Sequence, residues 1–143
     1  MKKRGSAADT NPQNLQRTYG RASMRASIVI ADDDPDILNI VATALEANGY
    51  EVHRASNGRE AVDQVRAKRP DVVIMDMMMP LMSGYEATSA LKADESTRAI
   101  PIVALSAKAM PADVARATEA GVDGYITKPF RMAHVLSAIA AYV

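Results

Sequence analysis

From residue 27 to the C-terminus, short apolar runs alternate with segments whose apolar residues recur at helical spacing. The apolar runs lie at about 27–31, 51–55, 71–75, 100–105 and 124–127. Parallel strands need long crossover connections, which are usually helices, so this alternation is typical of a parallel sheet covered by helices on both faces. The run at 71–75 is apolar on both faces, which indicates a central strand. The pattern predicts an α/β protein built from five strand–helix units.

Local signals predict where the helices begin and end. Asp34 followed by Pro35 is typical of a helix start, and Gly49 of the end of the same helix. Asn57 with Glu60 three residues later predicts a capping box on the next helix. The helical side chains that we expect to face the core are Leu38, Val41, Leu45, Ala61, Val62, Val65, Tyr85, Thr88, Leu91, Val114, Ala117, Thr118, Val135, Leu136 and Ile139.

The composition of the chain restricts its class. With 143 residues it fits one domain with its own core, and leaves no room for a second catalytic or DNA-binding domain. The absence of cysteine excludes disulfides, thiolate metal sites and a cysteine nucleophile. No apolar stretch approaches the ~20 residues that span a bilayer. We therefore expect a soluble, cytoplasmic protein without a membrane partner and without direct DNA binding.

The first 26 residues differ in composition from the rest of the chain. They carry six Lys or Arg and one Asp, whereas residues 27–143 carry 11 basic and 16 acidic residues. Hardly any large apolar side chain occurs in residues 1–26, which predicts a disordered basic extension ahead of one domain at 27–143. We interpret the extension as an expression remnant or an upstream start, with Met24 as the natural initiator, in preference to an electrostatic tether.

Polar side chains follow four of the predicted strands at the point where each strand ends. Asp32 and Asp33 follow the first apolar run, and Asp76 follows the third. Ser106 and Lys128 follow the fourth and fifth runs. The carboxyl ends of parallel strands share one edge of the sheet, where ligands bind in open α/β folds. The sequence therefore predicts a polar site at this edge.

Carboxylates gathered at one edge require a compensating charge. Two of them held ~4 Å apart repel by ~4 kcal/mol at an effective dielectric near 20. A hard divalent cation offsets this repulsion, so we expect Mg²⁺, with Mn²⁺ as a substitute, at Asp33 and Asp76. Lys128 opposite the metal and the Ser106 hydroxyl would form a clamp for a phosphoryl group. Asp76 is then the candidate nucleophile, because carboxylates form aspartyl phosphates.

This ordered set of residues resembles the receiver domain of two-component response regulators. The residues that carry the resemblance are Asp32-Asp33, Asp76 with Pro80 and Gly84, Ser106-Ala107 and Lys128-Pro129. The resemblance covers about residues 27–143. It implies a flavodoxin-like (βα)5 doubly wound fold with five parallel strands in the order 2-1-3-4-5. It also implies a stand-alone phosphoprotein, similar to the chemotaxis-Y proteins, that works in phosphorelay signal transduction.

The resemblance assigns a role to each residue of the site. Asp76 corresponds to the phosphoacceptor, and Lys128 to the lysine that contacts the phosphoryl oxygens. Asp33 corresponds to a direct metal ligand, Asp32 to an acid that acts largely through water, and the main-chain carbonyl of Met78 to a further ligand. These assignments predict a magnesium-dependent phosphoryl transfer to Asp76.

The family also implies a conformational switch and partners. Ser106 corresponds to the hydroxyl residue that turns toward the phosphoryl group, and Tyr125 to the aromatic residue that repacks with it. The output surface would be formed by the fourth helix, fifth strand and fifth helix of the domain. The implied donor is a histidine kinase or phosphotransfer protein, and the target is a separate protein. Whether phosphorylation drives homodimerisation stays open.

Simpler interpretations apply to several residues. Asp34 is interpreted as a helix cap outside the metal site. His53 and His134 lie apart from the acidic motifs and are not expected to bind metal or phosphate. An alternative for Tyr125 is that it packs as an ordinary half-buried strand residue without a switch role. Filling of gaps near the Asp76 loop, in preference to a partner surface, is expected for Met77, Met78, Met79 and Met82.

Three other functions compete with a self-modifying switch that is not a turnover enzyme. An aspartyl-phosphate phosphohydrolase usually has a second acid two residues after the nucleophile, where this chain has Met78. A nucleotide-binding module would need a glycine-rich turn in place of Asp33-Asp34-Pro35. A phosphorylation-independent interaction module would not need the acids, Ser106 and Lys128. The residues therefore favour the phosphoryl-accepting switch.

Overall fold

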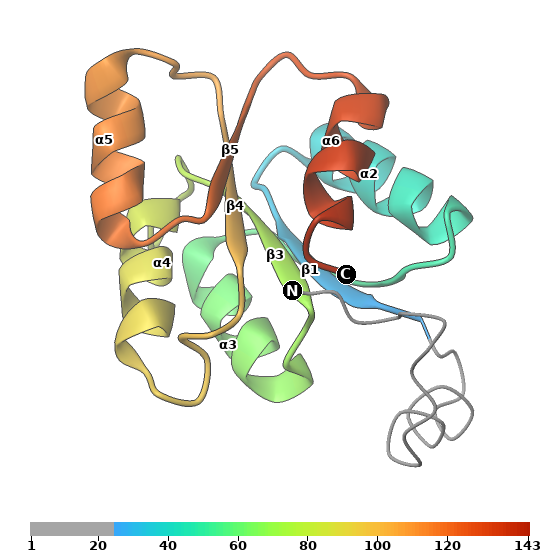
Figure 1. The fold of residues 1–143 in the computed structure, drawn as a ribbon, viewed down its shortest axis with the longest axis horizontal. Helices are drawn as coiled ribbons and strands as arrows, with labels where there is room; N and C mark the ends of the chain where they lie inside the picture. The colour runs from blue at the N-terminus through green and yellow to red at the C-terminus, as the bar shows by residue number, and fades with distance from the viewer. Residues whose placement is uncertain (1–24) are drawn as a thin grey trace.

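The computed structural model describes residues 25–143, in which strands and helices alternate along the chain (Figure 1). The strands are β1 (Ser27–Ala31), β2 (Glu51–Ala55), β3 (Val72–Asp76), β4 (Ile102–Ser106) and β5 (Gly124–Thr127). The helices are α2 (Pro35–Ala47), α3 (Gly58–Lys68), α4 (Gly84–Ala93), α5 (Pro111–Ala120) and α6 (Met132–Ala140). The predicted α/β alternation is confirmed. Of the extension predicted at 1–26, residues 1–24 lie outside the described part of the chain.

The strands form one parallel sheet in the order β2-β1-β3-β4-β5, as predicted. The chain passes from β1 to β2 on one side and then returns to place β3 on the other side of β1. Helices α2 and α6 cover one face of the sheet, and α3, α4 and α5 cover the other (Figure 1). The order of strands therefore reverses between β1 and β3, which is where open α/β sheets bind ligands.

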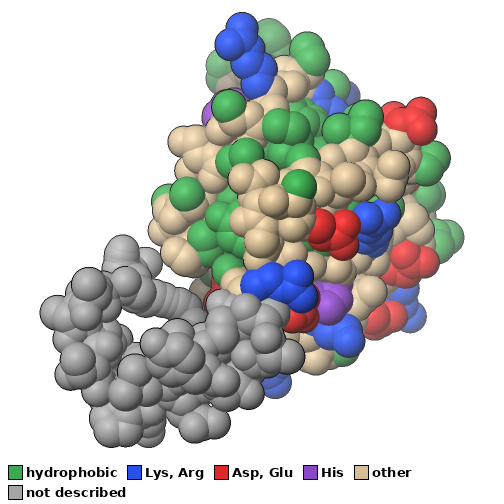
Figure 2. Space-filling view, turned by 90° about the vertical axis from the view of Figure 1, so that its right-hand side faces the viewer, with side chains coloured by type: hydrophobic (Ala, Val, Ile, Leu, Met, Phe, Trp, Pro, Cys, Tyr) green, Lys and Arg blue, Asp and Glu red, His purple; other side chains and the backbone are tan. Residues whose placement is uncertain are grey.

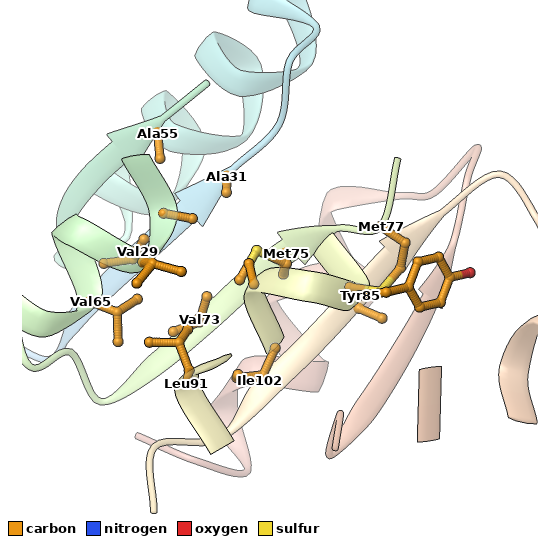
Figure 3. Close-up of a cluster of buried hydrophobic side chains, with 14 of the residues drawn as sticks. Val29, Ala31, Ala55, Val65, Val73, Met75, Met77, Tyr85, Leu91 and Ile102 are labelled. Atoms are coloured by element: carbon orange, nitrogen blue, oxygen red, sulfur yellow. The ribbon is translucent and has the colours of Figure 1, made fainter. Parts of the chain in front are cut away.

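The two faces of the sheet carry separate hydrophobic cores. On β3, Val73 and Met75 pack toward α3 and α4, whereas Val72 and Ile74 pack toward α2 and α6. Figure 3 shows the first core, in which Leu91 of α4 lies against these strands. All five β3 residues are buried. Each fully buried aliphatic side chain contributes ~1.5–3 kcal/mol relative to exposure, so β3 and its equally buried neighbours β1 and β4 are firmly held.

The capping pattern differs from the prediction on one helix. Asn57 caps α3 by accepting from the Glu60 N–H at 2.8 Å. The Glu60 carboxylate, however, accepts from the N–H and hydroxyl of Ser56, so the predicted box is half formed. A complete reciprocal box occurs on α4, between Ser83 and Glu86. The same S-x-x-E spacing was present there in the sequence.

Two further boundaries and one side chain depart from expectation. Strand β3 begins one residue later than predicted, at Val72, and β4 begins two residues later. The later start of β4 arises because the Ile100 N–H closes a turn on the Thr97 carbonyl and Pro101 has no N–H. Thr118 is exposed, since the buried side of α5 is confined to Ala117.

The surface mixes the two signs of charge on the face shown in Figure 2. Acidic and basic side chains are interspersed there, and hydrophobic side chains gather toward the top of the view. Residues 27–143 contain more acidic than basic residues, but the acidic side chains do not gather into a single patch on this face. Within residues 25–143, no helix has the length and apolar character needed to cross a membrane.

Two glycines fix the backbone of the loop between β3 and α4. The Gly84 N–H donates to the Met77 carbonyl at 3.0 Å, and the Gly58 N–H donates to the Met82 carbonyl at 3.0 Å. A Cβ on Gly84 would lie 2.6 Å from Met77 Cα and closer still to the carbonyl oxygen of Asp76. These neighbours are backbone atoms that cannot rotate away. The close approach at Gly84 therefore sets the position of the last residue of β3.

We expect Gly84→Ala to lower the free energy of unfolding by about 2–3 kcal/mol, because the methyl group overpacks against fixed backbone. Gly124→Ala is the matched control, since its added Cβ would meet its nearest atom at 3.5 Å and strand alanine is preferred to glycine. The control should change stability by less than about 1 kcal/mol. Urea unfolding of both variants measures the difference, and equal effects would contradict this account of the loop.

Candidate functional site

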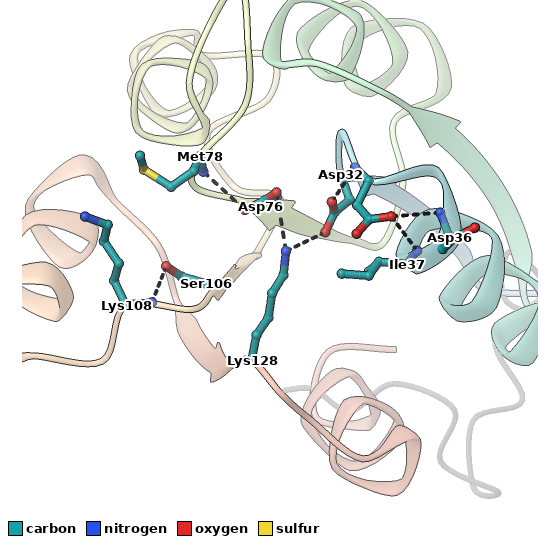
Figure 4. Close-up of polar contacts among 9 residues, drawn as sticks. Asp32, Asp36, Ile37, Asp76, Met78, Ser106, Lys108 and Lys128 are labelled. Carbon is teal, nitrogen blue, oxygen red and sulfur yellow. Dashed lines mark hydrogen bonds and ion pairs between the residues drawn. The ribbon is translucent and has the colours of Figure 1, made fainter.

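The predicted site residues meet at the carboxyl edge of the sheet (Figure 4). Asp32 follows β1, Asp76 is the last residue of β3, and Lys128 follows β5. One carboxylate oxygen from each of Asp32, Asp33 and Asp76 lies within 4.8 Å of the other two. The structure therefore brings together the three acids and the lysine that the strand ends predicted.

Hydrogen bonds of the sheet continue into this edge and hold the backbone of the site. The Asp32 N–H donates to the Ala55 carbonyl at 3.1 Å, beyond the last pair of β1 and β2. The Lys128 N–H donates to the Ser106 carbonyl at 2.8 Å in the same way beyond β4 and β5. The Lys128-Pro129 peptide bond is cis. The sheet hydrogen bonds thus fix the backbone from which the Asp32 and Lys128 side chains project.

The three acids differ in exposure and in hydrogen bonding. Asp32 is fully buried and Asp76 is 4% exposed, whereas Asp33 is exposed. One Asp32 oxygen accepts from the Asp34 N–H at 2.9 Å, and one Asp76 oxygen accepts from the Met78 N–H at 3.1 Å. These local bonds fix both buried carboxylates and leave the second oxygen of each directed at the site.

Lys128 lies between the two buried carboxylates. Its Nζ is 3.0 Å from Asp32 Oδ2 and 3.5 Å from Asp76 Oδ2. Burial alone would lower the pKa of Lys128, but the Asp32 and Asp76 carboxylates outweigh it and hold the pKa above its ordinary value. Lys128 is therefore charged at neutral pH and contacts both acids.

One lysine does not fully compensate the acids. Burial raises the pKa of the Asp76 carboxyl to about 7, the Met78 N–H opposes this, and the Asp32 charge adds to it. Lys128 also lowers the pKa of Asp76, yet the net shift is upward. Burial is the largest cause of this shift, so the charged form of Asp76 is costly in the folded protein even beside Lys128.

The arrangement of oxygens fits a small hard cation. Asp32 Oδ2 is a buried acceptor that receives no well-aligned hydrogen bond among the described residues. Oxygens bound to one Mg²⁺ are at most ~4.2 Å apart, twice the ~2.1 Å metal–oxygen distance. A set within 4.8 Å meets this limit after a small shift or with one acid bound through water. The described part of the chain places no histidine in this acidic group, which agrees with an oxygen-only site.

Ser106 and Tyr125 both contact Lys108. Ser106 is fully buried, and its hydroxyl accepts from the Lys108 N–H at 3.0 Å. The Tyr125 hydroxyl donates to the carbonyl of the same Lys108. The two predicted switch residues are therefore connected through one residue of the loop between β4 and α5.

A further contact near the site was not found by sequence reasoning. The Arg116 guanidinium of α5 lies 3.8 Å from the centre of the Tyr85 ring on α4. Tyr85 is 5% exposed and follows Gly84 directly, so this stacking joins α5 to the loop after Asp76. Burial raises the pKa of Tyr85, with Tyr125 adding to the shift and Arg116 opposing it. No motif pairs the two residues, because the contact depends on how α4 and α5 pack.

The structure separates some side chains from the site. Asp34 caps α2 by accepting from the Asp36 and Ile37 N–H groups, as predicted. His53 contacts Glu51 at 2.8 Å on β2, away from the acidic group. His134 is exposed on α6.

The methionines after Asp76 do not share one environment. Met77 is fully buried, and Met79 and Met82 pack against the core. Met78 is 52% exposed, so gap filling was the wrong interpretation for this residue. Met77 and Met78 lie in the bend that follows β3, so the course of this loop, and not strand alternation, decides which of the two side chains is buried.

Comparisons with known proteins agree on one family. The family model "response regulator receiver domain" matches residues 28–140. The polar-differentiation response regulators DivK of Brucella anthropi and Brucella ovis are 38% and 37% identical over 120 residues, covering 84% of this chain and 98% of each relative. Chemotaxis response regulator CheY4 of Vibrio cholerae superposes with a TM-score of 0.79 at 30% identity, covering 83% of this chain and 99% of that chain.

A second similar solved structure contains a metal ion. The receiver domain of a sensor histidine kinase from Pseudomonas aeruginosa superposes with a TM-score of 0.77 at 30% identity, covering 82% of this chain and 97% of that chain. That protein has a magnesium ion coordinated in its active site cleft.

The raised pKa of Asp76 predicts how stability depends on pH without metal. An unfolded Asp titrates near pH ~3.9. Between about pH 4 and pH 7 the folded state therefore binds more protons than the unfolded state, and stability falls as pH rises through this window. Asp76→Asn removes this penalty and should raise the free energy of unfolding at pH 8 by about 2 kcal/mol, with little change near pH 4.

Urea unfolding at both pH values, in buffer with a chelator, measures this effect. Asp63→Asn is the control, because that acid is exposed on α3 away from the site. If the free energy of unfolding depended on pH in the same way for the parent and for Asp76→Asn, Asp76 would carry no such penalty.

Proposed function

Because the chain belongs to the response regulator receiver domain family, we propose that it accepts a phosphoryl group on Asp76 in an Mg²⁺-dependent reaction and signals through altered protein–protein contacts. The observation that carries the proposal is the group of Asp32, Asp33 and Asp76 facing Lys128. Lys128 alone compensates these acids incompletely, which favours the binding of a cation. A bound cation can in turn contact the oxygens of a phosphoryl group.

The proposed reaction is an in-line displacement at phosphorus. An Asp76 oxygen attacks the phosphorus of a phosphohistidine, the new P–O bond forms, and the P–N bond breaks. The departing imidazole nitrogen keeps the bonding electron pair and takes a proton from solvent. Lys128 releases part of its contact with Asp76 and pairs with the incoming phosphoryl oxygens. The hydrogen bond from the Met78 N–H holds Asp76 in place during the attack.

The residues proposed to hold Mg²⁺ are Asp33 and Asp76 directly, Asp32 through water, and the main-chain carbonyl of Met78. When bound, the cation supplies the positive charge that neutralises both the acids and the transferring group. Asp33 is exposed beside two buried acids, which supports its role as the metal ligand on the solvent side of the site.

The proposed switch joins Ser106 to Tyr125. For the Ser106 hydroxyl to turn toward a phosphoryl group on Asp76, it must give up its bond from the Lys108 N–H. The Lys108 carbonyl also accepts from the Tyr125 hydroxyl. Movement of this loop would therefore weaken the hydrogen bond that holds the Tyr125 ring. The proposed readout surface is α5, β5 and α6, where two states of packing are biased by the charge added to Asp76.

The proposed partners follow from this chemistry. The donor is a histidine kinase or a phosphotransfer protein, and the target is a separate protein that binds the switched surface. Direct DNA or membrane binding is not part of the proposal, and homodimerisation on phosphorylation is left to measurement. We propose that the protein acts in the cytoplasm and modifies itself without turning over a substrate.

Intact-mass measurement after incubation with acetyl phosphate and Mg²⁺ tests the phosphoacceptor. The parent should gain about 80 Da, the mass of one phosphoryl group, and Asp76→Asn should not. A chelator should abolish the gain. Adducts on both proteins would remove Asp76 from its role, and multiple turnovers of a phosphomonoester per chain would favour the phosphohydrolase instead.

The Ser106–Tyr125 coupling has its own measurement. Tyr125 ring resonances should shift when beryllium fluoride, a phosphoryl analogue, is added with Mg²⁺, and the shift should be reduced in Ser106→Ala. Tyr50 lies on the far side of the domain, beside β2, and serves as the internal control. Identical Tyr125 signals with and without the analogue would contradict the coupling.

A further inference from the structure

Helix α5 is held to the rest of the domain by little buried surface. Ala117 is the one residue of this helix that is fully buried, and its N-cap residue, Met110, makes no side-chain hydrogen bond to the helix. Among the described elements, α4 is the main packing partner of α5, and the two helices lie side by side (Figure 1). Elements with few buried contacts shift at low cost in free energy. The contacts between α5 and α4 therefore determine where α5 rests.

Helix α4, in contrast, is fixed at its N-terminus to the loop after Asp76. Its first turn is closed by the reciprocal capping box of Ser83 and Glu86. The Gly84 N–H donates to the Met77 carbonyl at 3.0 Å. Five of the ten residues of α4 are buried, against one of the ten in α5. The boundary between α4 and α5 thus separates a firmly packed helix from a loosely packed one.

The stacking of Arg116 on Tyr85 crosses this boundary. The Arg116 guanidinium lies 3.8 Å from the centre of the Tyr85 ring, which is 5% exposed. Arg116 makes no hydrogen bond or ion pair within residues 25–143, although Glu86 and Glu119 line the same groove between the two helices. The ring, and not an acidic side chain, therefore sets the position of the guanidinium.

Tyr85 also lies near the proposed switch. Tyr125 packs against the hydrophobic core that contains Tyr85, and Figure 3 shows the Tyr85 ring at one end of this core. Tyr125 also contributes to the raised pKa of Tyr85. In the proposed switch, Tyr125 and α5 belong to the part that repacks, whereas Tyr85 belongs to the fixed helix α4. A contact that spans a fixed and a repacking element stabilises one of the two states and not the other.

We propose that the Arg116–Tyr85 stack is a latch that holds α5 and Tyr125 in their resting arrangement, the one in this structure. Arg116 is then a positioning residue for the switch and takes no part in the chemistry at Asp76. The inference rests on the proposed function and deepens it, because the latch sets the fraction of protein that has switched before any phosphoryl group is added. Charge added at Asp76 has to overcome this contact.

Loss of the latch should make the switch easier. A phosphoryl analogue favours the switched state, so its apparent affinity rises with the fraction of protein already in that state. Arg116→Ala should therefore lower the beryllium fluoride concentration at half-saturation about two- to fivefold, the range expected for loss of an exposed cation–π contact. Alanine has the highest helix propensity, so the substitution does not weaken α5 itself. The Tyr125 ring resonances in saturating Mg²⁺ measure the half-saturation.

Two further variants separate the latch from other effects of removing a charge. Glu119→Ala removes an exposed charge from the same helix and the same groove but leaves the stack in place, so it should match the parent. Tyr85→Leu removes the ring and keeps a large apolar side chain. In the Tyr85→Leu background, Arg116→Ala should have no further effect, because the contact that it removes is already absent. The Mg²⁺ concentration at half-saturation without beryllium fluoride should be the same for Arg116→Ala and the parent.

A half-saturation concentration in Arg116→Ala that equals or exceeds that of the parent would overturn the proposal. So would the same shift in Glu119→Ala, since charge in the groove and not stacking would then set the switch. A full effect of Arg116→Ala in the Tyr85→Leu background would also overturn it. If Tyr125 of the parent does not respond to beryllium fluoride, the proposed switch itself is absent, which is distinct from a failure confined to the latch.

Discussion

Holding the carboxylates of Asp32 and Asp76 out of water and beside each other is the constraint on which the rest of this structure depends. The ends of β1 and β3 bring Asp32, Asp33 and Asp76 within 4.8 Å, and Lys128 from the end of β5 compensates them in part. Such an arrangement costs stability in the absence of a cation, as the raised pKa of Asp76 indicates. The fold sustains this cost because the strands that carry the site are buried on both faces.

The same constraint explains how a small protein can respond to one added group. Two of the acids are fixed by local N–H donors, and the backbone around them is tied to neighbouring strands. The hydroxyl of Ser106 and the ring of Tyr125 are held by single bonds to Lys108. In the proposed switch, charge added at Asp76 would act on a centre held by several hydrogen bonds, and the Ser106 hydroxyl and the Tyr125 ring would respond through Lys108.

Sequence reasoning was most successful where one physical rule determines the outcome. Buried parallel strands read as continuous apolar runs, and residues at their carboxyl ends must share an edge, so the sheet and the grouping of Asp76 with Lys128 were predictable. It was weakest where tertiary packing decides. The Arg116–Tyr85 stacking depends on the contact of two helices, and the outward side chain of Met78 on the course of a loop. The Glu60 carboxylate accepts from the Ser56 N–H, whereas its motif implied the Asn57 N–H as the donor.

The most direct test of this account is a carbon-13 NMR titration of the Asp76 side-chain carboxyl, with and without Mg²⁺. Without metal, the midpoint should lie near pH 7, where burial and Asp32 place it. With saturating Mg²⁺ it should fall well below that value, because the cation stabilises the charged form. A midpoint near the ordinary value of ~3.9 in both conditions would contradict the claim that the acids of this site are held together at an electrostatic cost that a cation relieves.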